Sequence, residues 1–183
     1  VQTSKGIDIT TRFRTSFDDV FGKTLDLTWT TGTTYAIEQE RQVFDDSPVI
    51  DRVGRIGSPE WVSQSTVSLL WDRYEFLWQG RYIGRTQFED DEVDPVVTFR
   101  SNFQLNTTQL TAIDEIAERK FYNDITLTGD FDTFAVTFGI NNALNAKPAL
   151  VHNSVRPNRN NAVSSAGYDF FGRTFFLSGS VKF

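Results

Sequence analysis

Apolar and polar residues alternate with a period of two along most of the chain. In the first segment Ile7, Ile9, Phe13 and Phe17 share one face, and the residues between them are charged or hydroxylated on the other. Because successive side chains of a β-strand point to opposite sides, this pattern is typical of strands. The alternation recurs and predicts seven strands, over residues 5–17, 23–37, 60–71, 74–86, 120–131, 134–142 and 172–183.

The predicted strands are long, and the connections between them alternate in length. Several strands exceed the ~5–6 residues usual in globular proteins and match the ~9–11 residues that cross a bilayer at a tilt. Short and long connections follow one another in chain order: 18–22, 38–59, 72–73, 87–119, 132–133 and 143–171. Short turns at one side and long loops at the other are typical of an outer-membrane barrel.

The residues of the polar face indicate which face of the sheet meets water. A lipocalin-like soluble barrel also alternates, with its apolar face inward. Here, however, the polar face is charged, with Asp8, Arg12, Arg14, Asp26, Glu75 and Arg81. Charges suit a water-filled lumen and do not suit a dry core, so we expect the apolar face to point outward into lipid.

Aromatic residues gather near both ends of the predicted strands. At the short-turn end we place Phe17, Phe21, Trp71, Tyr74 and Phe183, and near the long-loop end Tyr35, Trp61, Tyr82, Tyr122 and Phe175. Two such groups resemble the interfacial girdles of a membrane barrel. The sequence therefore predicts an all-β, antiparallel transmembrane β-barrel, with a soluble all-β module as the alternative.

An odd number of strands does not suit a complete barrel. Intact single-chain bacterial barrels have even strand numbers, and about seven strands would leave two open edges in the bilayer. We therefore expect residues 1–183 to be the C-terminal portion of a larger barrel, and the absence of an initiator methionine favours this interpretation. The alternative is one strand missed in a small eight-stranded barrel.

Composition narrows the classes of function. The 183 residues carry a formal net charge of −6, with no Cys, no Met and one His. Without cysteine there is no zinc or iron–sulfur site built on sulfur, and one His cannot make a multi-histidine metal centre. We expect no cofactor. An acidic chain does not suit a nucleic-acid binder. No stretch reaches the ~18 apolar residues of a membrane helix. No catalytic constellation is apparent, so we expect no enzyme.

Five segments resemble one family in the same order along the chain. The tail Tyr168–Phe183 resembles the C-terminal strand of TonB-dependent outer-membrane receptors. Residues 139–148, GINNALNAKP, resemble their penultimate strand and the start of the last outside loop. Gly54–Trp61, Gln79–Gly84 and Phe121–Phe131 match in order, so the resemblance covers nearly the whole chain.

This resemblance implies a role in nutrient uptake. In that family a 22-stranded barrel encloses an N-terminal plug, binds a scarce nutrient such as an iron chelate, vitamin or carbohydrate, and receives energy through the TonB–ExbB–ExbD system. The chain would supply strands 16 to 22 and lack the plug domain and TonB box. Its partners would be outer-membrane lipid, the remaining barrel and plug, and the barrel-assembly machinery of a Gram-negative bacterium. The alternative is a small standalone barrel, porin-like or adhesive. The third interpretation is a soluble β-rich module such as a carbohydrate-binding domain.

The C-terminal strand carries the first set of candidate site residues. The resemblance implies that Phe175, Leu177, Val181 and Phe183 form the barrel-assembly signal. The simpler interpretation is that they only face lipid. At Ser178 and Gly179 the chain departs from the family, which commonly has Gly and then a larger residue, and this weakens the signal.

Charged residues of the polar face form the second set. The predicted lumen-lining residues are Arg12, Arg14, Asp26, Glu75 and Arg81. They would form a network of ion pairs, with Asp8 as a further partner, or line a path for an anionic substrate. Each pair would contribute little where water reaches it.

The long loops hold further candidates. The acidic run 89–94 is a candidate calcium site, although its spacing favours a solvated charge run. Helical spacing over Thr111–Lys120 predicts a short helix that packs the loop. His152 is expected at the surface, and Asn106 begins a glycosylation sequon that would need a eukaryotic secretory context. The residues that bind the nutrient are not evident.

Overall fold

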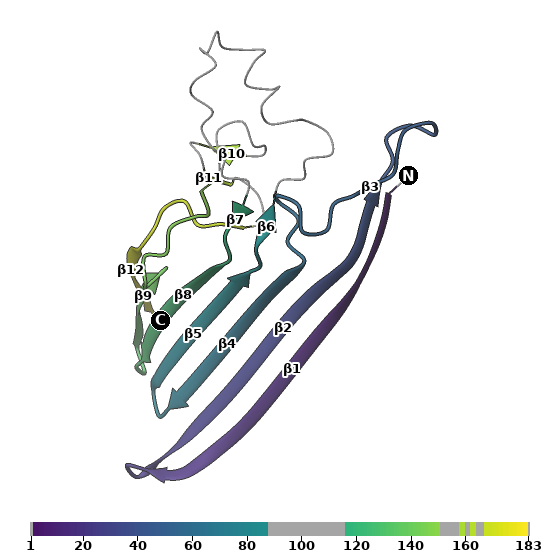
Figure 1. The fold of residues 1–183 in the computed structure, drawn as a ribbon. Helices are drawn as coiled ribbons and strands as arrows, with labels where there is room; N and C mark the ends of the chain where they lie inside the picture. The colour runs from purple at the N-terminus through teal and green to yellow at the C-terminus, as the bar shows by residue number, and fades with distance from the viewer. Residues whose placement is uncertain (1, 88–115, 151–157, 160–161, 164–166, 183) are drawn as a thin grey trace.

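The computed structural model describes residues 2–87, 116–150, 158–159, 162–163 and 167–182, and its regular elements are strands (Figure 1). In this part of the chain no helix is long and apolar enough to cross a membrane. The calcium candidate at 89–94, the glycosylation candidate Asn106, and His152 lie outside the described residues.

Seven long strands form one antiparallel sheet in which each strand pairs with the next long strand along the chain. These strands are β1 (Gln2–Val20), β2 (Lys23–Arg41), β4 (Trp61–Trp71), β5 (Tyr74–Ile83), β8 (Lys120–Asp130), β9 (Phe134–Asn141) and β12 (Thr174–Val181). All seven predicted strands are therefore confirmed, within a few residues at their ends. Tight turns bring β2, β5 and β9 back beside the strands that precede them, and the long connections join the resulting hairpins into one meander.

Five short strands lie in the long connections. β3 (Ile50–Asp51) extends the sheet beside the last residues of β2. β6 (Thr86–Gln87) pairs with β7 (Ile116–Ala117), and β10 (Asn158–Arg159) pairs with β11 (Ala162–Val163). All of them are at the end of the sheet opposite the tight turns (Figure 1), as the alternation of loop lengths predicts.

The tight turns use backbone conformations that few residues adopt. Val20 pairs with Lys23, so the β1–β2 turn has two central residues, Phe21 and Gly22, with φ of 51° and 76°. Positive φ at both positions gives a twist that matches the twist of the flanking strands. The β4–β5 turn likewise has two residues, with Asp72 at a φ of 54°.

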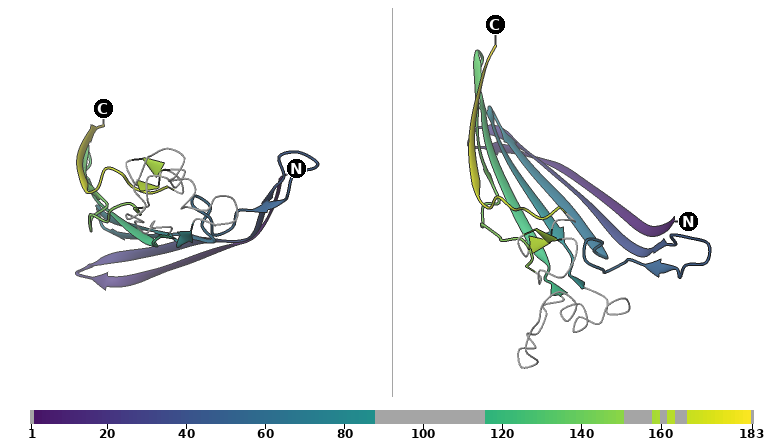
Figure 2. Two further views of the ribbon diagram at one scale, coloured as in Figure 1. Left: turned by 45° about the horizontal axis from the view of Figure 1, so that its top comes forward. Right: turned by 90° about the horizontal axis from the view of Figure 1, so that it is seen from above.

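The sheet is curved and open. Figure 2 shows β10 and β11 on its hollow side, with β1 and β12 at opposite edges. The β1–β2 hairpin extends beyond its neighbour at the loop end, because β4 pairs with β2 only between Leu25 and Tyr35. A register shift between Lys5 and Gly6 marks the start of this extension. A closed barrel is not present in the described chain.

The buried core is small and lies on the hollow side at the loop end. It consists of Ile56, Ile83, Ala117, Tyr122, Ala149, Val163 and Tyr168. Ile83 and Tyr122 belong to the polar face by alternation, so this core explains why the apolar Ile83 interrupts that face. Loop residues cover the two side chains there.

The helix predicted over Thr111–Lys120 is wrong in its described part. Ile116 and Ala117 form β7, and Lys120 begins β8. Ala117 is fully buried opposite Thr86, so packing against the core overrides a local helical spacing. Residues 111–115 lie outside the described residues.

Candidate functional site

The strand register aligns the apolar positions into rows that cross the whole sheet. One row contains Thr15, Leu27, Leu69, Phe76, Leu127, Phe138 and Leu177. The next row toward the loop end contains Phe13, Trp29, Val67, Trp78, Ile125, Ile140 and Phe175. Because these residues alternate with Ile83 and Tyr122, they occupy the face opposite the buried core, which is the convex face.

Many large apolar side chains on the convex face are exposed, whereas those of the central strands, such as Phe76 and Trp78, are half-buried. Leu177 has 75% of its surface exposed, Phe175 63% and Phe13 49%. Contiguous apolar patches of this extent are rare on soluble monomers and mark a surface that contacts a protein partner or a membrane. We refer to this set of rows as the apolar belt.

A chain of ring contacts borders the apolar belt at the short-turn end. Ring centroids lie 6.4 Å apart for Phe21 and Trp71, 6.2 Å for Trp71 and Tyr74, and 6.3 Å for Tyr74 and Phe131. The indole N–H of Trp71 also donates to the carbonyl of Val20 at 2.9 Å. Aromatic rings with a polar group satisfied at one end suit a boundary between apolar and wet surroundings. Phe183, predicted in this group, lies outside the described residues.

At the loop end the aromatic group differs from the prediction in one residue. Tyr35 and Trp61 lie 5.7 Å apart on the convex face, where the Tyr35 hydroxyl donates to Glu60 at 2.7 Å. Tyr122 is instead on the hollow face and 1% exposed. Placing it in the outer aromatic group was wrong, because its position in the alternation faces the core and loop residues cover it.

Hydroxyl side chains on the convex face pair with each other across strands. Thr31 Oγ1 lies 2.7 Å from Ser65 Oγ, and Thr33 Oγ1 lies 2.9 Å from Ser63 Oγ. Ser63 Oγ also donates to the carbonyl of Gly32 at 3.3 Å. The hydroxyls of Thr31, Thr33, Ser63 and Ser65 are therefore satisfied within the sheet, without water.

The five predicted lumen-lining residues share the hollow face. Arg12 is opposite Thr30, Arg14 opposite Thr28 and Asp26 opposite Ser16. Glu75 and Arg81 of β5 follow the same alternation. The guanidinium of Arg81 lies 5.1 Å from the centre of the Tyr122 ring, a cation–π contact at the edge of the core.

The expected network of ion pairs does not form among the described residues. The predicted carboxylates accept hydrogen bonds from hydroxyls: Asp26 from Ser16, Glu75 from Ser68, and Asp8 from Thr34. Salt bridges in this part of the chain involve other residues, such as Lys5 with Glu38 at 2.6 Å. The reason is the register, which places neutral residues directly across from each arginine.

The predicted assembly residues lie on the edge strand β12. Phe175, Leu177 and Val181 face the convex side with Ser178 and Ser180 between them, and 64% of Val181 is exposed. Phe183 lies outside the described residues. Beside them Phe176 covers Gly139 on the hollow face, where an added Cβ would lie 2.1 Å from the ring.

Asn142 organises the start of the last loop and was not singled out in the sequence. Its side-chain amide donates to the carbonyl of Ala146 at 2.9 Å and to Asp169 at 2.7 Å, and its Oδ1 accepts from the amide of Ala146 at 2.8 Å. It has a positive φ of 49°, which asparagine tolerates better than most residues. Nearby, burial raises the pKa of Tyr168.

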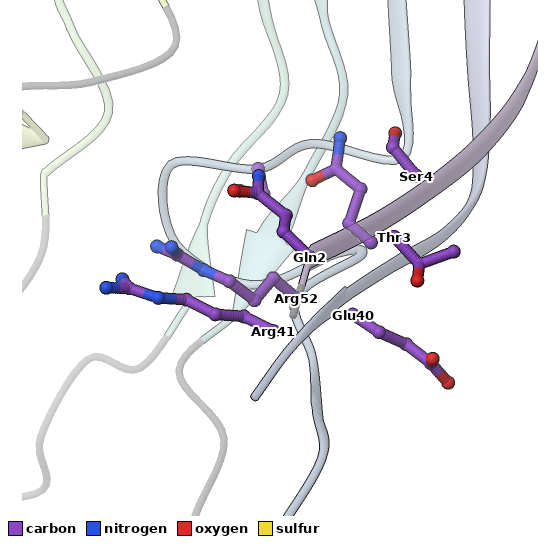
Figure 3. Close-up of a pocket in the computed structure, with 8 residues that line it drawn as sticks. Gln2, Thr3, Ser4, Glu40, Arg41 and Arg52 are labelled. Atoms are coloured by element: carbon purple, nitrogen blue, oxygen red, sulfur yellow. The ribbon is translucent and has the colours of Figure 1, made fainter. Parts of the chain in front are cut away.

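Two polar cavities lie at the loop end, and sequence reasoning missed both. One, of about 280 Å³, is lined by Gln2, Thr3, Ser4, Gln39, Glu40, Arg41, Arg52 and Ser58 (Figure 3). The other, of about 290 Å³, is lined by Val53, Gly54, Arg55, Glu60, Arg85, Thr86 and Gln87. Their residues come from segments far apart in sequence, so no local motif signals them. Among the described side chains no group of acidic residues and histidines is arranged to hold a metal ion.

Comparison with known proteins gives no relative: no protein-family model, curated protein or solved structure matches the chain.

Proposed function

We propose that the chain is a wall segment of a transmembrane β-barrel in the outer membrane of a Gram-negative bacterium, and that the barrel belongs to a TonB-dependent nutrient receptor. The observation that carries the membrane part is the exposed apolar belt, which crosses seven strands on the convex face while charged residues occupy the hollow face. The resemblance of five sequence segments supports the receptor part.

The dimensions of the convex face support a bilayer as its surroundings. Convex-facing residues of β2 run from Leu25 to Tyr35, a difference of 10 positions. At ~3.3 Å per residue this distance is about 33 Å, and at a tilt of ~40° it spans about 25 Å, the height of the apolar band of outer-membrane barrels. Aromatic pairs lie at both limits of this span.

The unpaired backbone groups at the two edges of the sheet support a larger assembly. β1 and β12 each leave one side without a partner strand. In lipid each unpaired backbone group would cost several kcal/mol, so further strands must pair with both edges. We propose that the rest of the receptor barrel supplies them and that a plug fills the lumen. The segment acts by holding and passing a nutrient, without chemistry of its own.

Residues 1–183 contain no cysteine, so a single introduced thiol in this segment permits a direct test of the membrane proposal. Leu127→Cys places a thiol on the convex face, and Thr128→Cys places the matched control one residue away on the hollow face. In intact outer membranes we expect a water-soluble maleimide to label position 128 and to leave position 127 unlabelled until detergent is added. Equal labelling of both thiols would contradict the proposal.

The mass of the native polypeptide tests the receptor proposal. An antibody against residues 87–119 should detect, in denatured outer-membrane fractions, a chain several times larger than 20.9 kDa. A band near 20.9 kDa would instead favour a small standalone barrel. A folded monomer in water without detergent would favour a soluble binding module.

A further inference from the structure

We propose that the cavity of about 280 Å³ at the outer end of the β1–β2 hairpin binds a soluble oxyanion, a carboxylate or phosphate group, between Arg41 and Arg52. As a step in nutrient uptake this assignment rests on the proposed function. As a binding site it rests on the geometry alone.

The two arginines reach the same cavity from different segments. Arg41 ends β2 and pairs with Gln2, whereas Arg52 follows β3. In Figure 3 both side chains extend in the same direction as Gln2, so two guanidinium groups and one amide border a single space. Guanidinium is a planar donor that binds carboxylate and phosphate through two parallel hydrogen bonds.

Nearby carboxylates do not neutralise these arginines. Among the described lining residues the only acid is Glu40, and in Figure 3 it points to the opposite side of the hairpin. Glu38 pairs with Lys5 at 2.6 Å. Asp51 accepts hydrogen bonds from the backbone amides of Gln39 and Val53, at 3.1 and 3.0 Å. The two like charges therefore share a cavity in which an oxyanion would relieve their repulsion.

The backbone that carries the arginines is well supported. The amide of Arg52 donates to the carbonyl of Gln39 at 2.9 Å, which fastens the second segment to the hairpin. Ser58, which also lines the cavity, bonds through its backbone to Arg55 at 2.8 Å and to Gly54 at 2.9 Å. Such a frame limits the conformational entropy lost when a ligand binds.

The position of the cavity favours a dissolved ligand. Gln2, Ser4, Gln39 and Arg41 alternate with Glu38 and Glu40, and lie on the hollow side of the sheet. They also lie beyond the Tyr35–Trp61 pair that limits the convex span. The volume suits a small anion, or the anionic end of a larger ligand, since drug-sized ligands occupy ~300–1,000 Å³. The second cavity is a weaker candidate, because Glu60 lines it beside Arg55 and Arg85.

Calorimetric titration of the detergent-solubilised full chain tests the assignment, with citrate and pyrophosphate as probes. We expect saturable binding, weakened about tenfold or more by Arg41→Gln and by Arg52→Gln, because each removes charge-assisted hydrogen bonds. Arg73→Gln, at the short-turn end of the sheet, is the matched control and should change affinity less than about twofold. Near-ultraviolet circular dichroism would verify that each variant keeps the fold.

Three outcomes would overturn the assignment. They are no binding of either probe, equal affinity in the Arg41→Gln or Arg52→Gln variant, and an equal loss of affinity in Arg73→Gln, which would indicate general attraction of anions. The maleimide experiment is independent of this titration. Protection of position 127 without citrate or pyrophosphate binding refutes the site alone, and binding without protection refutes the membrane proposal alone.

Discussion

The convex and hollow faces of the sheet are built from neighbouring residues of the same strands, yet they differ in almost every property. On the convex face many large apolar side chains are exposed, and the hydroxyls pair with each other. On the hollow face the carboxylates bond to hydroxyls, and the small buried core packs under the loops. The same strands thus present one surface suited to apolar surroundings and one suited to water. Placing the same substitution at positions on opposite faces of one strand tests this difference.

The largest effect is expected from a charge placed on the apolar belt. Ile125→Arg puts a guanidinium on the convex face in the row of Trp29, close to the middle of the span from Leu25 to Tyr35. If this face meets lipid as proposed, the substitution should cost about 2–4 kcal/mol. Thr128→Arg puts the same group on the hollow face opposite Glu75 and should cost little. Urea unfolding of the protein in lipid vesicles measures both. Equal losses of unfolding free energy in the two variants would contradict the proposed difference between the faces.

A smaller effect is expected from close packing on the hollow face. An added Cβ at Gly139 would lie 2.1 Å from the Phe176 ring, so Gly139→Ala should lower the free energy of unfolding by about 1–3 kcal/mol. Gly32→Ala is the control, since nothing lies within 4 Å of its added Cβ. Combining Gly139→Ala with Phe176→Leu should restore part of the loss. A double variant as unstable as the sum of the two single variants would show that the ring contact is unimportant.

Removing the Asn142 side chain should destabilise the loop that packs against the hollow face. Asn142→Ala leaves the carboxylate of Asp169 and two backbone groups of Ala146 without these partners, at a cost of about 1–3 kcal/mol. Limited proteolysis should then cut near residues 146–169 faster, while the strands stay protected. Asn141→Ala is a suitable comparison, because that side chain makes a single exposed bond to Thr174. Unchanged cleavage in Asn142→Ala would contradict the role of this residue.

The smallest effect is expected from protonation of the Asp51 carboxylate, in β3, at low pH. Hydrogen bonds from the amides of Val53 and Gln39 hold the pKa of Asp51 below its usual value. A lowered pKa stabilises the folded loop above the unfolded-state pKa of ~3.9, and this stabilisation is lost as pH falls through the folded pKa. Exchange-measured protection of the Gln39 and Val53 amides should therefore weaken below about pH 4. Asp51→Asn should remove this pH dependence, and a persistent dependence in that variant would assign it to another group.

The sequence predicts the strands well because period-two alternation is a local property. Each residue of β1 or β9 faces one side or the other whatever the rest of the chain does, and a tight turn such as Phe21–Gly22 fixes which strands pair. The loops are different. Ala117 joins a strand because it packs beside Thr86, and Tyr122 is buried because Tyr168 and its neighbours return over it. These contacts join residues tens of positions apart.

The sequence by itself determined an all-β chain with seven alternating strands, short turns at one end, and charged and apolar residues sorted onto opposite faces. Only the tertiary structure decided the register, which aligned the apolar positions into continuous rows and placed neutral residues across from Arg12 and Arg14. It also decided that Arg41 and Arg52 border one cavity. The physical reason is that the face of a residue follows from its own strand, whereas its partners follow from how distant segments pack.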